Sequence, residues 1–170
     1  SPRPLFSQAR SGHGWIWQNP LPQGNPLYSI HFAKDKENGY AVGSDDTILH
    51  TDDGGFHWER QFSTRDVTLA GIFVRDSRNA VVVGSRGTIL ITDDAGKFWQ
   101  PVKTEVKDHL YSVVFTGVNF ETGWAVGTYG RIIKSSDGGR TWRTQNSGVS
   151  EHLLNVAAFD AQNASVVGAN

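Results

Sequence analysis

An eight-residue pattern recurs along this sequence and constrains its fold more than any other feature. Its clearest copy is Ser-Ser-Asp-Gly-Gly-Arg-Thr-Trp at residues 135–142, and weaker copies occupy residues 51–58 and 92–99. A fourth, incomplete copy ends at Trp17 and retains only Gly14 and the Trp. Because an Asp carboxylate accepts hydrogen bonds from backbone N–H groups in a turn and a Gly supplies a positive φ, each copy predicts a tight hairpin anchored in the core by its Trp. The residues given this structural role are Thr51, Asp53, Gly55, Trp58, Thr92, Asp94, Gly96, Trp99, Ser135, Asp137, Gly139 and Trp142.

The spacing of the pattern defines a repeating unit. Trp17, Trp58, Trp99 and Trp142 lie 41, 41 and 43 residues apart, and each precedes a Leu that opens an alternating apolar stretch. These stretches predict first strands, and second strands are expected to end in Val-Gly, where neighbouring sheets crowd together. A third strand leads into the Asp-bearing turn, and a fourth runs through the Trp. The first strands are expected at 27–32, 69–74, 110–115 and 153–159, and the third strands at 47–50, 88–91 and 131–134.

A period of this length with four strands per unit predicts an all-β fold, a β-propeller or propeller segment of four-stranded antiparallel blades, with about four repeats of 41–43 residues. The chain divides into the end of one blade (1–26), three blades (27–68, 69–109 and 110–152), and the first two strands of another (153–170). The two ends of the chain can close one blade and so a four-bladed ring, or two copies can form a larger ring. An excised piece of a longer chain is the third alternative.

Composition excludes several classes of protein. The 170 residues carry a formal charge of -1, which gives no sign of nucleic-acid binding, and no apolar run is long enough to span a bilayer. Zero cysteines removes disulfides and thiolate metal sites, and the six histidines form no metal-binding motif. No metal and no cofactor are therefore expected. A start at Ser1 with no Met in the chain indicates a processed or excised product.

The combined pattern of residues 123–142, Gly-Trp-Ala-Val-Gly-Thr-Tyr-Gly-Arg-Ile-Ile-Lys followed by the eight-residue motif, is echoed in residues 39–58. The motif resembles the Asp-box, the bacterial neuraminidase repeat, and the whole pattern resembles the photosystem II stability and assembly factor family and its bacterial relatives. That resemblance implies a propeller, seven-bladed in photosynthetic members, that binds protein partners without chemistry of its own. It also implies a bacterial, periplasmic or secreted protein. The chain departs from the family in its smaller number of repeats and in Ala95, where a Gly is usual.

Function in propellers usually lies in loops that differ between blades. The turns after the Val-Gly pairs place Asp45, Arg86 and Tyr129 at equivalent positions with different chemistry, and Arg131 follows the third. Since Arg and Tyr are favoured at interface centres, these four residues are the candidates for contact with a protein partner. The connections between blades are expected on the same side, and they carry Arg65, Asp66, Lys107, Asp108, His109, Glu151 and His152. The alternative is an ordinary solvated rim.

The competing function is a carbohydrate-active propeller, because sialidases and xyloglucanases also carry Asp-boxes. Such a glycoside hydrolase needs a pair of carboxylates or an arginine cluster with a nucleophile. Arg86 and Arg131 supply only part of an arginine cluster. Asp53, Asp94 and Asp137 recur in every repeat, so we assign them to their own turns and not to catalysis or calcium binding. No catalytic residue is predicted.

Overall fold

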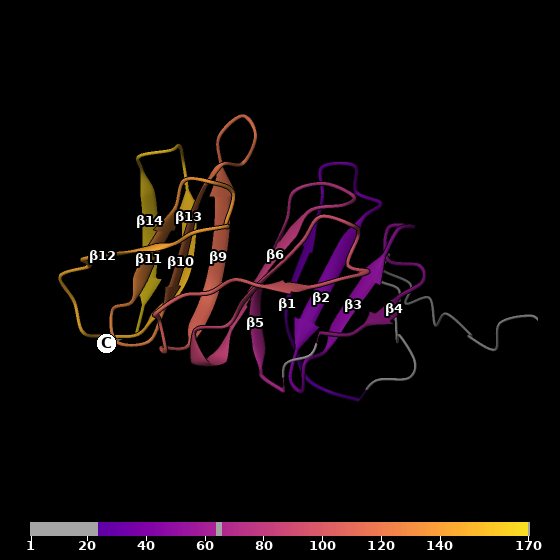
Figure 1. Cartoon of the computed structure of the whole chain (residues 1–170), viewed down its shortest axis with the longest axis horizontal. Helices are drawn as coiled ribbons and strands as arrows, with labels where there is room; N and C mark the ends of the chain where they lie inside the picture. The colour runs from indigo at the N-terminus through magenta and orange to yellow at the C-terminus, as the bar shows by residue number, and fades with distance from the viewer. Residues whose placement is uncertain (1–23, 64–65, 170) are drawn as a thin grey trace, which may run out of the picture.

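The computed structural model describes residues 24–63 and 66–169, and within them the chain forms four antiparallel sheets that follow one another along the sequence (Figure 1). The first sheet contains β1 (Leu27–Phe32), β2 (Gly39–Gly43), β3 (Ile48–Thr51) and β4 (Glu59–Gln61). The second contains β5 (Leu69–Val74), β6 (Ala80–Gly84), β7 (Ile89–Thr92) and β8 (Gln100–Pro101), with a short 3₁₀ turn, η1 (Ser85–Gly87), between β6 and β7. The third contains β9 (Leu110–Thr116), β10 (Thr122–Gly127), β11 (Ile132–Ser135) and β12 (Arg143–Gln145). The fourth contains β13 (Leu153–Ala158) and β14 (Ala164–Gly168).

Each of the first three sheets pairs its strands in sequence order, as a four-stranded meander. The expected all-β fold of four-stranded antiparallel units is therefore confirmed. The fourth strands differ slightly from expectation, since each begins one residue after its Trp, which itself lies in the turn. Residues 1–23 lie outside the described residues. They include the incomplete copy of the motif that is predicted to end at Trp17 and most of the predicted segment 1–26.

The first strands of successive sheets lie next to one another. β1 lies beside β5, β5 beside β9, and β9 beside β13. The first and fourth sheets end up on opposite sides of the molecule (Figure 1). Each sheet thus presents a back face to the sheet before it and a forward face to the sheet after it.

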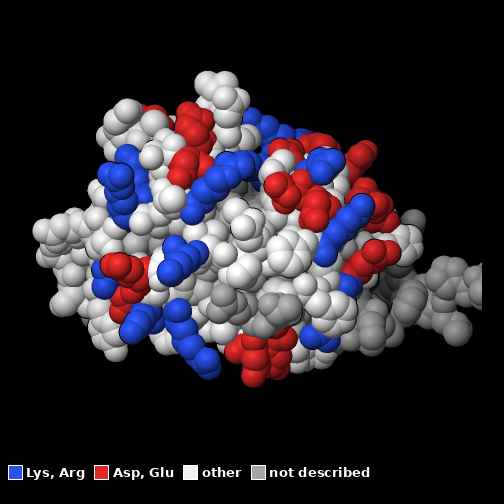
Figure 2. Space-filling model, viewed as in Figure 1, with Lys and Arg blue, Asp and Glu red and all other residues white. Residues whose placement is uncertain are grey.

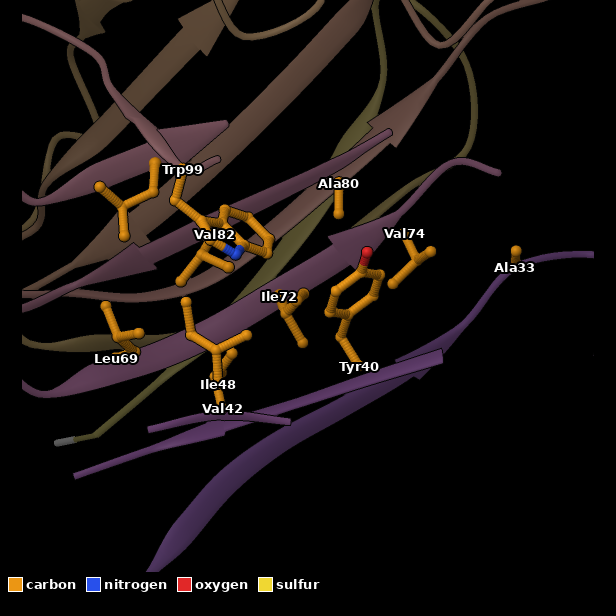
Figure 3. Packing of buried hydrophobic residues seen from close by; sticks show 11 residues of the cluster. Ala33, Tyr40, Val42, Ile48, Leu69, Ile72, Val74, Ala80, Val82 and Trp99 are labelled. Atoms are coloured by element: carbon orange, nitrogen blue, oxygen red, sulfur yellow. The ribbon is translucent and has the colours of Figure 1, made fainter. Parts of the chain in front are cut away.

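Apolar side chains fill the space between successive sheets. In the first cluster Tyr40, Val42 and Ile48 on the forward face of the first sheet meet Leu69 and Ile72 of the second (Figure 3). The same arrangement recurs at the next two boundaries. The equivalent sets are Val42 with Leu69 and Ile72, Val83 with Leu110 and Val113, and Val126 with Leu153 and Val156. A single sheet of this kind has two apolar faces, so stacking against neighbours stabilises it.

The glycine of each Val-Gly pair has a different role from the one expected. A Cβ at Gly43, Gly84 or Gly127 would lie 2.0, 2.3 or 1.8 Å from a carbonyl oxygen of the residue that precedes the first strand of the same sheet. Neighbouring sheets are not the cause of the crowding. The backbone that enters each sheet crosses directly over the end of its second strand, and only glycine leaves room for it.

Candidate functional site

The turns between second and third strands lie against the connections that lead into the next sheet. The amide of Asp46 donates to Val67 O at 2.9 Å, that of Gly87 to Asp108 O at 2.8 Å, and that of Gly130 to Glu151 O at 2.8 Å. We call this side of the molecule the turn surface, made of the turns 44–46, 85–87 and 128–130 and the connections 66–68, 102–109 and 146–152. Arg65 lies outside the described residues.

Three of the candidate residues occupy the same strained backbone position. Asp45, Arg86 and Tyr129 have φ of 51°, 55° and 55°, in the left-handed region, and all three side chains are exposed. A non-glycine residue there costs about 1–3 kcal/mol, and such strain concentrates at functional sites. The turn therefore holds a different side chain outward from each of three successive sheets.

Tyr129 is supported by the connection below it. Its side chain is 72% exposed, and its ring packs edge-on against that of His152 with centroids 5.2 Å apart. The amide of Tyr129 also donates to Nδ1 of His152 at 3.2 Å. These two contacts fix the turn under an exposed aromatic ring, an arrangement suited to contact with a partner.

Arg131 is engaged within the protein. Its Nε donates to Oδ2 of Asp108 at 2.6 Å, and both side chains are partly buried. The pair ties the start of the third strand in the third sheet to the connection that precedes that sheet. Arg131 consequently supports the turn surface, whereas Arg86, Tyr129 and Asp45 are exposed to solvent.

A hollow of about 210 Å³ opens beside Arg86. Its walls combine two cations, Arg86 and Lys103, with the apolar side chains of Ile89, Val102 and Val106. Most of the surface exposed in this hollow is polar, so its two cations suit a chain segment that carries a carboxylate.

Sequence reasoning missed a row of bulged residues on the first strands. In every sheet the pairing of first and second strands skips one residue, which leaves Tyr28, Ala70, Tyr111 and Leu154 in β-bulges. The hydroxyl of Tyr28 lies 3.0 Å from Oγ of Ser44, so the bulged residue of the first sheet reaches the turn surface. Bulges redirect side chains and are frequent beside functional sites. The only sequence signal is their constant position after the Leu that opens each repeat.

The Asp-box turns form one hydrogen-bond pattern in all three complete sheets. In the second, Thr92 Oγ1 donates to Asp94 Oδ1 at 2.9 Å and accepts from the amide of Gly96 at 2.9 Å, while Asp94 Oδ1 accepts from the amide of Phe98 at 3.0 Å. The other two boxes repeat these contacts through Thr51 with Asp53 and Gly55, and through Ser135 with Asp137 and Gly139. Trp99 is buried, and Trp58 and Trp142 are half-buried.

These contacts also set the ionisation of the box carboxylates. Burial disfavours the charged form of Asp53, but hydrogen bonds from His57 and Thr51 outweigh it and lower the pKa of Asp53 to about 2. The amide of Phe98 chiefly lowers the pKa of Asp94. Each of these carboxylates is therefore held by hydrogen bonds within its own turn.

A second repeated turn also escaped sequence reasoning. Asp35, Asp76 and Asp160 each accept from the amide and the side chain of an Asn three residues later in the hairpin between first and second strands. The pattern Asp-x-x-Asn, present in three of the four repeats, is the signal that could have identified it.

Within residues 24–63 and 66–169 no group of three or more His, Asp or Glu could hold a metal ion. Over the same residues no helix is long and apolar enough to cross a membrane. Figure 2 shows basic and acidic side chains interspersed over one side of the molecule.

Stacked four-stranded meanders with an Asp-box between third and fourth strands define a β-propeller of Asp-box repeats. The chain belongs to the family described as Photosynthesis system II assembly factor YCF48, whose model matches residues 9–107, 63–142 and 97–170. No curated protein matches the sequence.

Solved structures share the fold at low identity. A structure of YCF48 bound to D1 peptide is 20% identical with a TM-score of 0.66 over 78% of this chain and 45% of that one. An ancestral GH74 enzyme is 16% identical, with a TM-score of 0.69 over 91% of this chain and 24% of that one. The GH74 enzyme of Niastella koreensis is 17% identical, with a TM-score of 0.68 over 84% and 26%. The chain thus spans less than half the length of each of these structures.

Proposed function

We propose that this chain is a non-catalytic scaffold that binds a protein partner, and that an extended segment of the partner lies on the turn surface. The observation that carries the proposal is the exposure of Arg86 and Tyr129 at strained, equivalent turn positions of adjacent sheets. A turn whose backbone is already fixed loses little backbone freedom on binding, which favours affinity.

The hollow beside Arg86 suggests what kind of segment binds. Arg86 and Lys103 would attract a carboxylate of that segment to this mainly polar hollow. Tyr129 offers a second contact on the next sheet. Family membership supports a protein partner, and a D1 peptide is the ligand in the solved YCF48 structure.

A glycoside hydrolase is the weaker alternative. Likeness to two GH74 enzymes at 16% and 17% identity supports the fold alone. A glycosidase general acid needs a raised pKa. In the described part of the chain the resolved carboxylate pKa shifts are all downward, at Asp35, Asp53, Asp76, Asp94, Asp137, Glu151 and Asp160. A periplasmic or secreted location in a bacterium stays a prediction that rests on the family resemblance.

Fluorescence anisotropy with a labelled D1 peptide tests the proposal. Tyr129→Ala and Arg86→Glu are each expected to weaken binding about tenfold or more, as central interface residues do. Phe98→Ala and Lys97→Glu are the matched controls, since both side chains are exposed on an Asp-box turn at the opposite end of the strands. No binding, or binding that the turn-surface variants leave unchanged, contradicts the proposal.

A further inference from the structure

A hollow of about 80 Å³ opens between the second and third sheets, at the end of the strands that carries the Asp-box turns. Arg75, which directly follows β5, and Arg140, in the Asp-box of the third sheet, both line it. Asp93, Phe98 and Gln100 of the second sheet line it as well. Because the turn surface lies at the opposite end of the strands, a ligand of this hollow is separate from the segment proposed to bind there.

Neither arginine is part of the repeated pattern of the sheets. Ala33 occupies the position of Arg75 in the first sheet, since the amide of each donates to the carbonyl of the Asn that precedes the second strand. Lys97 occupies the position of Arg140 in the Asp-box of the second sheet. The boundary between the first and second sheets therefore has Ala33 and Lys97 where this boundary has two arginines. Positions that differ on a constant frame are the ones that usually carry function.

The backbone of the third sheet holds Arg75 in place. Nη2 of Arg75 donates to Phe120 O at 3.1 Å and to Gly138 O at 2.9 Å, and the guanidinium lies 5.5 Å from the ring centroid of Phe115. Its Nε is buried and has no hydrogen-bond partner among the described residues. Burial and the neighbouring charge of Arg140 lower the pKa of Arg75, so nearby carboxylates do not fully offset these two effects.

Arg140 also lacks a carboxylate partner. Its side chain is exposed, and its Nη1 donates to the carbonyl of Asp137 at 3.2 Å. In the described part of the chain neither Arg140 nor Arg75 takes part in an ion pair. Two guanidinium groups that retain N–H donors thus line one hollow, and such donors match the oxygens of a carboxylate or a phosphate.

We propose that this hollow binds a single carboxylate group, held by N–H donors of Arg75 and Arg140. Asp93 reduces the charge of the lining from two positive charges to one, which favours a monovalent carboxylate over a dianionic phosphate. The volume of about 80 Å³ suits a carboxylate and the carbon beside it, since one water takes about 30 Å³. The rest of the ligand then extends past Phe98, whose side chain is 62% exposed. The carboxylate can belong to a small organic acid or to an acidic side chain of a polypeptide.

An NMR titration with acetate tests the site. The Nε–H signals of Arg75 and Arg140 are expected to shift to saturation as acetate replaces chloride at constant ionic strength. Arg140→Gln should weaken acetate binding about tenfold or more, because it removes a charged donor. Its side chain is exposed, so this variant should fold, which circular dichroism checks. Arg143→Gln is the matched control, since Arg143 is exposed on β12 and does not line this hollow.

The titration has two outcomes that overturn the proposal. One is the absence of a saturable shift at both Arg75 and Arg140. The other is equal acetate binding by the Arg140→Gln and Arg143→Gln variants, which would mean that Arg140 holds no carboxylate.

Two further probes identify the ligand. Inorganic phosphate at about pH 8, where it is mainly dianionic, is expected to bind more weakly than acetate, and Asp93→Asn should reduce that difference. Tighter binding of phosphate by the unaltered chain overturns the assignment to a carboxylate. A tripeptide with blocked ends and a central Glu separates the two sources: tighter binding than acetate supports an acidic side chain, and weaker binding supports a small organic acid.

Discussion

The backbone amide of Val74 donates to Nδ1 of His31 at 3.0 Å, a hydrogen bond that crosses from the first sheet to the second. The ring of His31 also lies 4.8 Å from that of Phe73, centroid to centroid. Burial lowers the pKa of His31 below its ordinary value of 6.5, because it disfavours the charged ring. Only the neutral ring has the lone pair on Nδ1 that accepts this hydrogen bond. One boundary between sheets therefore depends on a neutral histidine.

Stability is expected to fall as the pH falls below about 6.5. In that range the unfolded chain binds a proton at His31 before the folded chain does, so acid favours unfolding. Burial lowers the pKa of His50 as well and acts in the same direction. Denaturation midpoints measured between about pH 8 and about pH 5 report this slope.

His31→Phe should flatten that slope and lower the stability at neutral pH. The substitution leaves the amide of Val74 without its acceptor, at a cost of about 1–3 kcal/mol. His109→Gln is the control, because His109 is exposed on a connection between sheets. A slope in the His31 variant equal to that of the unaltered chain would contradict the assignment.

The hydroxyl of each Asp-box is expected to stabilise the fold because it accepts a hydrogen bond from a glycine amide. Thr92→Val keeps the shape of a buried side chain but leaves the amide of Gly96 without an acceptor, for an expected loss of about 1–3 kcal/mol in the free energy of unfolding. Thr144→Val in the exposed β12 should change stability by less than about 0.5 kcal/mol. Equal effects at the two sites in urea denaturation would count against the role given to the box.

Acid unfolding should follow the box carboxylates. Hydrogen bonds hold the pKa of Asp53, Asp94 and Asp137 below 3.8 in the folded chain, so their contribution is present above that pH and lost as the pH falls through the folded values. Asp94→Asn removes one titrating group and should make the loss below pH 3.8 shallower. An unchanged acid transition would mean that Asp94 adds nothing to it.

Close backbone approach makes the glycine of Val126-Gly127 irreplaceable. Gly127→Ala would place a Cβ 1.8 Å from His109 O, and we expect it to lower stability by about 3 kcal/mol or to prevent folding. Gly24→Ala is the matched control, since nothing lies within 4 Å of its Cβ position. Thermal melting of the two variants side by side gives the comparison, and similar midpoints would contradict it.

Much of the fold could be predicted because the sequence repeats the same pattern of strands and turns in successive units. The first strands expected at 27–32 and 69–74 match β1 and β5, since an alternating apolar pattern reports local burial directly. The Asp-box turn was equally accessible, because its hydroxyl, carboxylate and glycine lie within five residues of one another.

Contacts between residues far apart in the sequence could not be predicted in the same way. The crowding at Gly127 involves His109, and the acceptor role of His31 involves Val74, 43 residues away. The bulge at Tyr28 depends on the register between two strands, which composition does not encode. Of the candidate site, sequence reasoning selected Arg86 and Tyr129 but not the pairing of Arg131 with Asp108.

Hydrogen–deuterium exchange with and without the labelled peptide tests the central claim, that the turn surface is where a partner binds. Binding is expected to slow exchange in the turns 85–87 and 128–130 and in the connection 102–109, and to leave the Asp-box turns 92–99 and 135–142 unchanged. Slower exchange confined to the Asp-box turns, with the turn surface unaffected, would contradict the claim.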